Sequence, residues 1–443
     1  MAVDFSYKRI WSITYPILVS LLMEQLIGLT DTAFMGRVGE VELGASALAG
    51  VFYLVAFMVG HGFCIGTQII MARRNGSQSY ASIGPIFYQG VYFLAALAAV
   101  LWGVCQLWAG DILSLLISSP NVLVKAESYV HWRVYGFFFA FAGGMFRSFY
   151  VATTHTSTLT LNSVVMVLSN VAFNYVLVFG KLGFPAMGIA GAAIGSSLSE
   201  LVSLIFFIVH THLHIDFSRY ALNSIPHFDF GVLRSVLGIS AWVMVQNFVS
   251  LSTWFIFFVY IEHLGEEPLA ITNIVRSLSG FLFMVVVAFA SACSSIVSNM
   301  LGAGQSHQIG SAIGRHVWLT YACVMPLVAL LALFPSTFIG IYTDIPLLVE
   351  ASVPSVWVMC ITYVVLVPSN VLFQSVSGTG STRAAFCIEM IALVFYMIYV
   401  TVLIYYMRVD VALAWTSEIV YGLLILVQSV VFLRRGTWCK RIV

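Results

Sequence analysis

Long apolar stretches alternate with short polar segments along the whole chain. A helix that spans a membrane needs ~20 mostly apolar residues, because lipid offers no hydrogen-bond partner to an open backbone. Turn-forming segments rich in Gly, Asn and charged residues, such as 36–40 and 73–76, separate the stretches. The pattern predicts twelve transmembrane helices, at 10–36, 44–72, 83–109, 126–152, 158–180, 187–210, 231–261, 269–300, 309–341, 349–378, 382–407 and 410–433.

Composition narrows the class of protein. Of the 443 residues, 60% are apolar and only 8% are charged, whereas soluble domains are ~45–50% apolar and ~25% charged. Nineteen basic and eighteen acidic residues give a net charge of +1, too little to hold a phosphate backbone. The seven cysteines include no C-x-x-C spacing. We therefore expect an all-α polytopic membrane protein without a cofactor, and neither a soluble enzyme nor a nucleic-acid-binding protein.

The distribution of Lys and Arg predicts the orientation in the membrane, since cytoplasmic loops carry the excess of both. With the N-terminus inside, thirteen of these residues fall on the cytoplasmic side, from Lys8 and Arg9 to Lys440 and Arg441, and they include Arg147. Four fall outside. Both termini are therefore predicted to be cytoplasmic.

The chain also resembles itself across its middle. Residues 38–43 match 264–269 at an offset of 226, and Gly76 matches Gly302 at the same offset. Two more matches follow in order, 124–126 with 349–351 and 199–202 with 417–420. Six helices per repeat put both copies the same way up, as parallel repeats with a cavity between them. We predict an N-terminal lobe at 1–211, a cytoplasmic connection at 212–230 and a C-terminal lobe at 231–443.

Acidic residues inside the predicted spans are the candidates for function, because an ionised group in hydrocarbon costs several kcal/mol. Five of the eighteen acids lie there: Glu24, Asp31, Glu200, Glu389 and Glu418. The alternative is that each carboxyl group is protonated or hydrogen-bonded to a neighbouring helix and only helps packing.

Helix rise places four polar side chains at one depth of the N-terminal lobe. Asp31 lies ~8 Å from the outer helix end, Asn174 and Asn170 ~9 and ~15 Å, and Ser196 ~13 Å. One carboxylate with neutral oxygens suits a monovalent cation or a proton. The two amides could instead be packing contacts between helices.

Further polar residues are secondary candidates. Glu24 and Glu200, at ~18 and ~20 Å, could form a deeper layer. Tyr135 lies at the depth of Asp31 and either bonds it or belongs to the aromatic belt of the membrane interface. Glu418 is a candidate in the C-terminal lobe.

Several motifs resemble the MATE family of multidrug and toxic-compound exporters. Pro16 followed by Leu29-Thr30-Asp31-Thr32 is similar to the family's first helix, and 66–73 to its G-T-x-x-x-x-A-R. Residues 170–175 fall on N-x-x-x-D-Y, and 188–194 on G-[VI]-x-G-A-A-[IL]. The resemblance covers the whole chain. It implies a twelve-helix exporter of two six-helix lobes, driven by inward movement of Na⁺ or H⁺.

Two departures from the family pattern bear on the coupling ion. Asn174 stands where the family has a second carboxylate, and the seventh and tenth helices carry no acid, only Gln246 and Asn247 nearby. The site then has a charge of −1 at most. This favours H⁺ over Na⁺ and leaves both open; for Na⁺, Asp31, Asn170 and Asn174 would be the ligands. Pro16, which lacks an N–H, is the predicted hinge of the first helix.

The predicted function is a cation-coupled antiporter that exports amphiphilic organic cations by alternating access, as a monomer in the bacterial inner membrane. The first alternative is a flippase for an anionic lipid-linked saccharide, which would need basic residues in its cavity; only Arg133 and Arg276 lie within spans. The second is a membrane-embedded hydrolase, although neither H-E-x-x-H nor G-x-S-x-G is present.

Overall fold

The structure is a computed structural model that describes residues 3–115, 117, 119–436 and 438. Within these ranges the regular secondary structure is helical throughout. The chain forms two compact units, an N-terminal unit of Tyr15–Met244 and a C-terminal unit of Val245–Val443 together with Met1–Thr14. Lys440 and Arg441, which we counted as cytoplasmic, lie outside the described residues.

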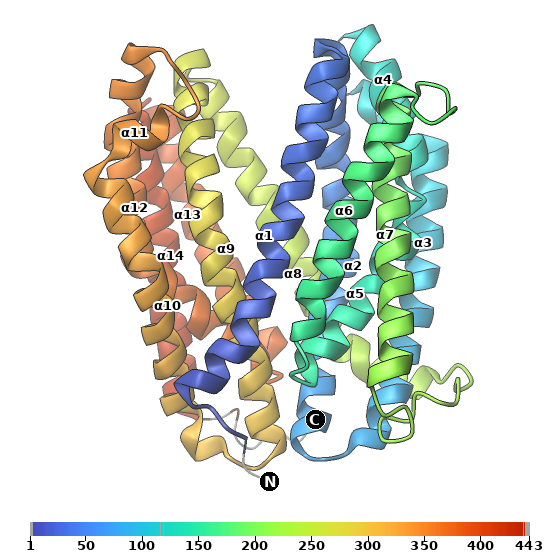
Figure 1. Cartoon of the computed structure of the whole chain (residues 1–443). Coiled ribbons are helices and arrows are strands. Elements are labelled where there is room, and N and C mark those ends of the chain that lie inside the picture. The colour runs from blue at the N-terminus through green and yellow to red at the C-terminus, as the bar shows by residue number, and fades with distance from the viewer. Residues whose placement is uncertain (1–2, 116, 118, 437, 439–443) are drawn as a thin grey trace. The chain divides into compact units, whose positions relative to one another are not determined.

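The N-terminal half of the chain contributes seven α-helices and one short 3₁₀ helix (Figure 1). They are α1 (Tyr7–Val38), α2 (Glu40–Gly76), η1 (Tyr80–Ser82), α3 (Ile83–Ser114), α4 (Pro120–Arg133), α5 (Gly136–Ala152), α6 (Ser157–Phe179) and α7 (Gly188–His214).

The C-terminal half contributes seven more α-helices, a second 3₁₀ helix and a π-helical turn. They are α8 (Phe230–Glu262), α9 (Glu266–Gly302), η2 (Ser306–Gln308), α10 (Ile309–Leu333), α11 (Pro335–Ile339), α12 (Pro346–Gly378), α13 (Thr382–Val400), η3 (Thr401–Tyr406) and α14 (Val411–Arg435).

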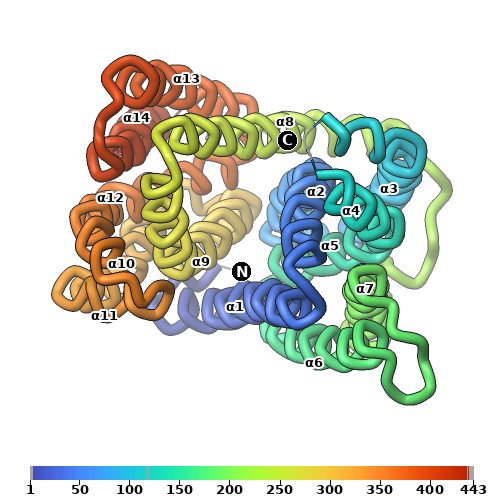
Figure 2. Tube along the Cα trace, turned by 90° about the horizontal axis from the view of Figure 1, so that it is seen from above, coloured from blue at the N-terminus to red at the C-terminus, as the bar shows by residue number. Residues whose placement is uncertain are grey.

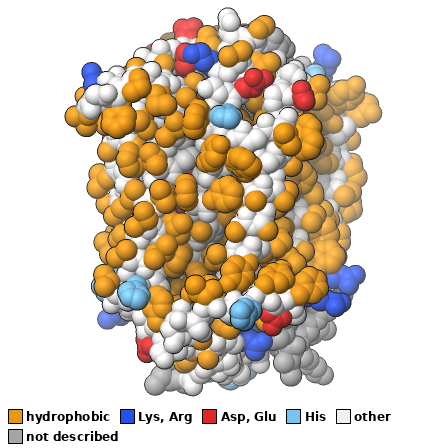
Figure 3. Space-filling view, turned by 90° about the vertical axis from the view of Figure 1, so that its right-hand side faces the viewer, with side chains coloured by type: hydrophobic (Ala, Val, Ile, Leu, Met, Phe, Trp, Pro, Cys, Tyr) orange, Lys and Arg blue, Asp and Glu red, His pale blue; other side chains and the backbone are white. Residues whose placement is uncertain are grey.

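The helices confirm the predicted fold class. Within the described residues, eleven helices are long and apolar enough to cross a membrane, and a twelfth span results if α4 and α5 count as one bent pair. Apolar side chains cover the middle of the face in Figure 3, while charged side chains gather toward its two ends. This is the surface expected of a protein whose middle faces lipid. The chain is an all-α integral membrane protein.

Three predicted helices differ in the structure. The fourth was expected at 126–152, but α4 starts at Pro120 and the axis bends by 50° between α4 and α5. Proline is favoured in the first turn of a helix, so residue 120 begins this one rather than ending a turn. The ninth, expected at 309–341, ends at Leu333, because Pro335 restricts the residue before it. The eleventh changes from α to π at Thr401.

The internal repeat is visible in the local structure. α2 and α9 both have 37 residues, and each follows a glycine, Gly39 or Gly265. A 3₁₀ helix and a long helix then follow in both halves, at the same offset of 226 residues. At this offset the bent pair α4–α5 corresponds to the single helix α12.

The boundaries of the compact units differ in detail from the lobes predicted at 1–211 and 231–443. Residues up to Thr14 group with the C-terminal unit, and those up to Met244 with the N-terminal unit. Helices α1 and α8 are therefore each divided between the units. The connection predicted at 212–230 lies against α3, where Gln89 donates to the carbonyl of His227 at 2.8 Å and Tyr88 to that of Leu222 at 2.8 Å.

Within the N-terminal unit, α6 and α7 pack side by side along their length, as Figure 2 shows from above. A hydroxyl pair joins α1 to α6, since Ser20 and Ser163 lie 2.7 Å apart. These three helices carry the candidate site.

Candidate functional site

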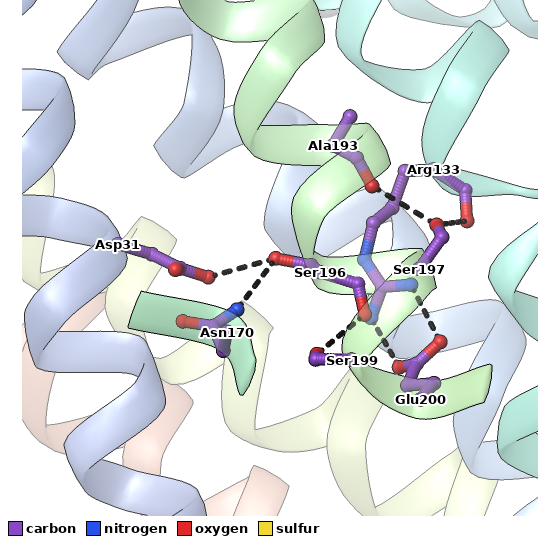
Figure 4. Close-up of polar contacts among 8 residues, drawn as sticks. All are labelled: Asp31, Arg133, Asn170, Ala193, Ser196, Ser197, Ser199 and Glu200. Atoms are coloured by element: carbon purple, nitrogen blue, oxygen red, sulfur yellow. Dashed lines mark hydrogen bonds and ion pairs between the residues drawn. The ribbon is translucent and has the colours of Figure 1, made fainter. Parts of the chain in front are cut away.

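Asp31 and three neutral polar side chains form one hydrogen-bonded cluster between three helices of the N-terminal unit. Asn174 Nδ2 donates to Asp31 Oδ1 at 2.6 Å, and Ser196 Oγ donates to Asp31 Oδ2 at 3.1 Å. Asn170 Nδ2 donates to Ser196 Oγ at 3.2 Å, and Asn174 Nδ2 also approaches Asn170 Oδ1 at 3.2 Å. Asn170 and Asn174 are four residues apart on α6 and so share one face. The structure thus brings together the four residues that depth arithmetic placed in one layer. Figure 4 shows three of them, Asp31, Asn170 and Ser196.

The neutral side chains of this cluster are buried, and one of their oxygens accepts no hydrogen bond in the described structure. Asn170 and Asn174 are 0% exposed and Ser196 is 5% exposed, while Asp31 is half-buried. Asn174 Oδ1 has no hydrogen-bond partner among the described residues, and an added Cβ on Gly195 would meet that oxygen at 2.3 Å. The glycine therefore leaves room for the amide. The site offers a carboxylate and one unused neutral oxygen.

A metal site of the usual kind is absent from the described part of the chain, where no group of three or more His, Cys, Asp and Glu side chains could hold an ion. A bound Na⁺ at Asp31 would need the oxygens of Asn170, Asn174 and Ser196 as further ligands. In the structure, the N–H and O–H groups of Asn174 and Ser196 point at the carboxylate instead.

Beside this cluster, α4 and α7 hold a buried ion pair. Arg133 donates two hydrogen bonds to Glu200, Nη1 to Oε2 at 2.9 Å and Nη2 to Oε1 at 2.5 Å. The guanidinium group lies 3.9 Å from the centre of the Tyr53 ring. Figure 4 shows Asp31 bonded to Ser196 and the ion pair beside Ser197. Glu200 is therefore neutralised by an arginine.

The space for this ion pair comes from a glycine. A Cβ on Gly136 would meet Arg133 Nη1 at 2.2 Å and Glu200 Oε2 at 2.4 Å. Gly136 is the first residue of α5, directly after the bend. The break between α4 and α5 and the ion pair thus occupy the same place.

Glu24 pairs with a different arginine. Arg147 of α5 forms an ion pair and hydrogen bond with Glu24 of α1, and Ser20 also approaches that carboxylate at 3.5 Å. Glu24 and Glu200, which we predicted to form a deeper layer, are each held by an arginine of a separate helix. Arg147, counted with the loop charges, lies within α5.

The other candidates lie elsewhere. Tyr135 packs on Trp102, with ring centres 5.9 Å apart, and forms no hydrogen bond with Asp31 in the described structure. Glu418 lies in the C-terminal unit, where it accepts a hydrogen bond from Tyr396 at 3.1 Å. Pro16 lies inside the continuous helix α1, two residues after the boundary between the units.

The pairing of Arg133 with Glu200 was missed from the sequence because the helix start was misplaced. Counted from residue 126, Arg133 appears shallow. Counted from Pro120, it lies ~20 Å along its helix, and Glu200 lies ~18 Å along α7. A proline in the first turn, followed by opposite charges at equal depth, was the signal that could have found the pair.

Solved structures of other proteins share the fold of this chain. A solved outward-facing structure of a multidrug resistance MATE family transporter has a TM-score of 0.89 at 15% identity, over 98% of this chain and 97% of that one. The Vibrio cholerae MATE transporter VcmN in its bent form has a TM-score of 0.87 at 16% identity, over 98% of both chains. At such low identity these two matches show a shared fold.

Similarity in sequence shows the family to which the chain belongs. A probable multidrug resistance protein NorM of Synechocystis sp. is 25% identical over 346 residues, which cover 76% of this chain and 73% of the relative. The MatE family model matches residues 16–176 and 243–402, one segment in each half of the internal repeat. The chain belongs to the MatE family.

Proposed function

We propose that this protein is a multidrug efflux transporter that exports amphiphilic organic cations in exchange for protons entering the cell. Membership in the MatE family and the similarity to proteins named for multidrug resistance support efflux. The helices that could span a membrane provide the setting for transport.

The observation that carries the coupling proposal is the uncompensated charge of Asp31. Its two hydrogen bonds come from neutral donors, Asn174 and Ser196. The nearest arginine of the network, Arg133, donates to Glu200 instead. Asp31 is therefore the carboxyl group of this cluster that a mobile cation can neutralise.

Proton binding fits the arrangement better than sodium binding. Each carboxylate oxygen already accepts one N–H or O–H bond, which leaves fewer of its lone pairs for Na⁺, an ion that needs several oxygen ligands at once. A proton needs one oxygen only. Once Asp31 is protonated, that oxygen becomes a donor and a poorer acceptor, so the bonds from Asn174 and Ser196 lose their charge assistance and can rearrange.

The rearrangement supplies the proposed link to alternating access. It releases α1 from α6 or α7 at Asp31, and α1 is already weakened at Pro16, where the carbonyl of Ser12 lacks its helical N–H partner. Bending there would reshape the substrate pathway and release the drug outward. Proton entry and drug export would thereby alternate.

The proposal also covers the orientation of the protein, its location and its oligomeric state. The excess of Lys and Arg favours cytoplasmic termini. The named relative is bacterial, which supports the bacterial inner membrane as the location. We propose that the monomer is the functional unit.

The alternatives fare less well. A flippase for an anionic saccharide lipid would need free cations, yet Arg133 is paired with Glu200 and Arg276 lies 5.4 Å from the centre of the Phe258 ring. The hydrolase is set aside, because the MatE family is a family of transporters and not an enzyme class.

The test is transport by the purified full chain in liposomes, with pH and Na⁺ gradients imposed separately. We expect the cationic dye ethidium to accumulate in vesicles with an acidic lumen, and nigericin, which collapses the gradient, to abolish accumulation. Protein-free liposomes are the control. Accumulation that needs a Na⁺ gradient and ignores pH would contradict proton coupling.

A further inference from the structure

A second buried carboxyl group lies in the C-terminal unit. Glu389 of α13 is 3% exposed, and its Oε1 accepts hydrogen bonds from Ser250 Oγ and from Tyr421 OH, both at 2.7 Å. Its other oxygen, Oε2, is buried and has no hydrogen-bond partner among the described residues. A buried oxygen without a partner is rare in native proteins and calls for a ligand or a proton.

The surrounding side chains form a reciprocal arrangement between α13 and α14. Glu389 of α13 accepts from Tyr421 of α14, whereas Glu418 of α14 accepts from Tyr396 of α13 at 3.1 Å. The two tyrosine rings lie 5.9 Å apart, edge to face. Each helix thus supplies one acid and one phenol.

This cluster contains no compensating cation. Neither glutamate forms an ion pair in the described structure. The titratable groups that face the pair are Tyr421 and Tyr396 and, from α12, Tyr363 near Glu418. From α8 the neutral hydroxyl of Ser250 faces Glu389.

Two ionised carboxylates in such surroundings would cost several kcal/mol each. Trp415, three residues before Glu418 on the same helix face, is 6% exposed and has an indole N–H without a partner in the described structure. The cluster therefore contains two carboxyl groups without a counter-charge. Glu389 Oε2 accepts no hydrogen bond there, and the indole N–H of Trp415 donates none, among the described residues.

We propose that Glu389 and Glu418, linked by Tyr396 and Tyr421, form a proton-binding site of the C-terminal unit, with the proton held at Glu389 Oε2. A metal ion fits poorly, because it needs several oxygen ligands and Glu389 Oε1 is already occupied by two hydroxyl hydrogens. A proton needs only the one free oxygen.

The two carboxyl groups lie at different depths. Each is seven residues, ~10 Å, from the start of its own helix, and consecutive helices cross the membrane in opposite directions. If the chain is the proton-coupled exporter proposed above, on which this role in transport rests, the site holds a second proton separate from the one at Asp31.

Infrared difference spectroscopy between about pH 6 and pH 9, a range in which exposed carboxyl groups stay ionised, tests the site without any transport. The full chain is reconstituted in lipid, and the carbonyl stretch of each protonated carboxyl group is recorded. Glu389→Gln should remove one such band. Tyr421→Phe should keep this band and move it to higher frequency, because the carbonyl loses a hydrogen-bond donor.

Two further variants separate this proposal from others. Asp31→Asn should remove a different band, and Glu350→Gln, at an exposed position, should remove none. The proposal is overturned if folded Glu389→Gln protein retains every band, or if Tyr421→Phe leaves all frequencies unchanged. If the Glu389→Gln variant loses its band while the wild-type protein fails to transport ethidium, the result supports this site and contradicts the proposed function.

Discussion

The two units of this protein hold the glutamates of their transmembrane helices in different ways. In the N-terminal unit Glu200 and Glu24 pair with Arg133 and Arg147. In the C-terminal unit Glu389 and Glu418 accept hydrogen bonds from hydroxyl groups and have no arginine partner in the described structure. The first arrangement fixes both charges in place, whereas the second leaves a carboxyl group that can gain or lose a proton.

The internal repeat shows which residues of the two units occupy corresponding positions. The sequence match of 199–202 with 417–420 aligns Glu200 with Glu418. At the offset of 226 that relates the ends of α4–α5 to those of α12, the position of Arg133 is taken by Met359, which is 1% exposed. At the offset of 225 given by the match of 124–126 with 349–351 it is taken by Val358, which is also apolar. The repeat thus retains the acid and replaces its cation by an apolar side chain. The scaffold is shared, and the chemistry of the two halves has diverged.

The largest expected effect is the loss of the arginine. Arg133→Met, which copies the second repeat, leaves Glu200 buried without a counter-charge and should lower the free energy of unfolding by about 3–5 kcal/mol. Thermal unfolding in detergent would show it. Adding Glu200→Gln should restore most of the loss, and Arg276→Met is the control. Equal stability of Arg133→Met and the wild type would remove the contrast between the units.

A smaller effect is expected at the bend between α4 and α5. Gly136→Ala places a methyl group against Arg133 and Glu200 and should cost about 1–3 kcal/mol of unfolding free energy. Gly143→Ala on the same helix is the matched control, because its Cβ would meet nothing within 4 Å. The control should be neutral or stabilising by up to about 1 kcal/mol. Similar melting temperatures for both variants would count against a tightly packed ion pair.

The smallest effect is expected in the C-terminal unit. Tyr421→Phe removes one hydrogen bond to Glu389 and should lower the unfolding free energy by about 1 kcal/mol, whereas Tyr405→Phe at an exposed position should change nothing. Differential scanning fluorimetry can compare the two. A loss as large as that of Arg133→Met would mean that the tyrosine compensates a full charge.

The sequence predicted the fold and the cluster at Asp31 because both depend on regular helix geometry. Twelve apolar stretches and a rise of ~1.5 Å per residue suffice to place Asp31, Asn170, Asn174 and Ser196 at one depth. The bend after Arg133 lies where the mixed segment 126–133, which contains Glu127 and His131, passes into the largely apolar segment 134–152. The prediction took both segments as one straight span and therefore missed the bend.

The arginine partners were missed for a related reason. Arg147 reads as a loop charge when a helix end is judged from hydropathy, and Arg133 reads as shallow when the helix start is misplaced. The direction in which a side chain points depends on how helices pack, and a single sequence does not contain that information. The orphaned oxygen of Glu389 is likewise a property of packing.

The most direct test of the account is the Asp31→Asn variant in proteoliposomes, with Asp111→Asn, at an exposed position, as the matched control. Asparagine resembles the protonated acid in shape and cannot release a proton. We predict that Asp31→Asn folds with a melting temperature near that of the wild type and loses ethidium accumulation driven by the pH gradient. The Asp111→Asn control should accumulate the dye normally. Accumulation by Asp31→Asn at the wild-type rate would contradict the account.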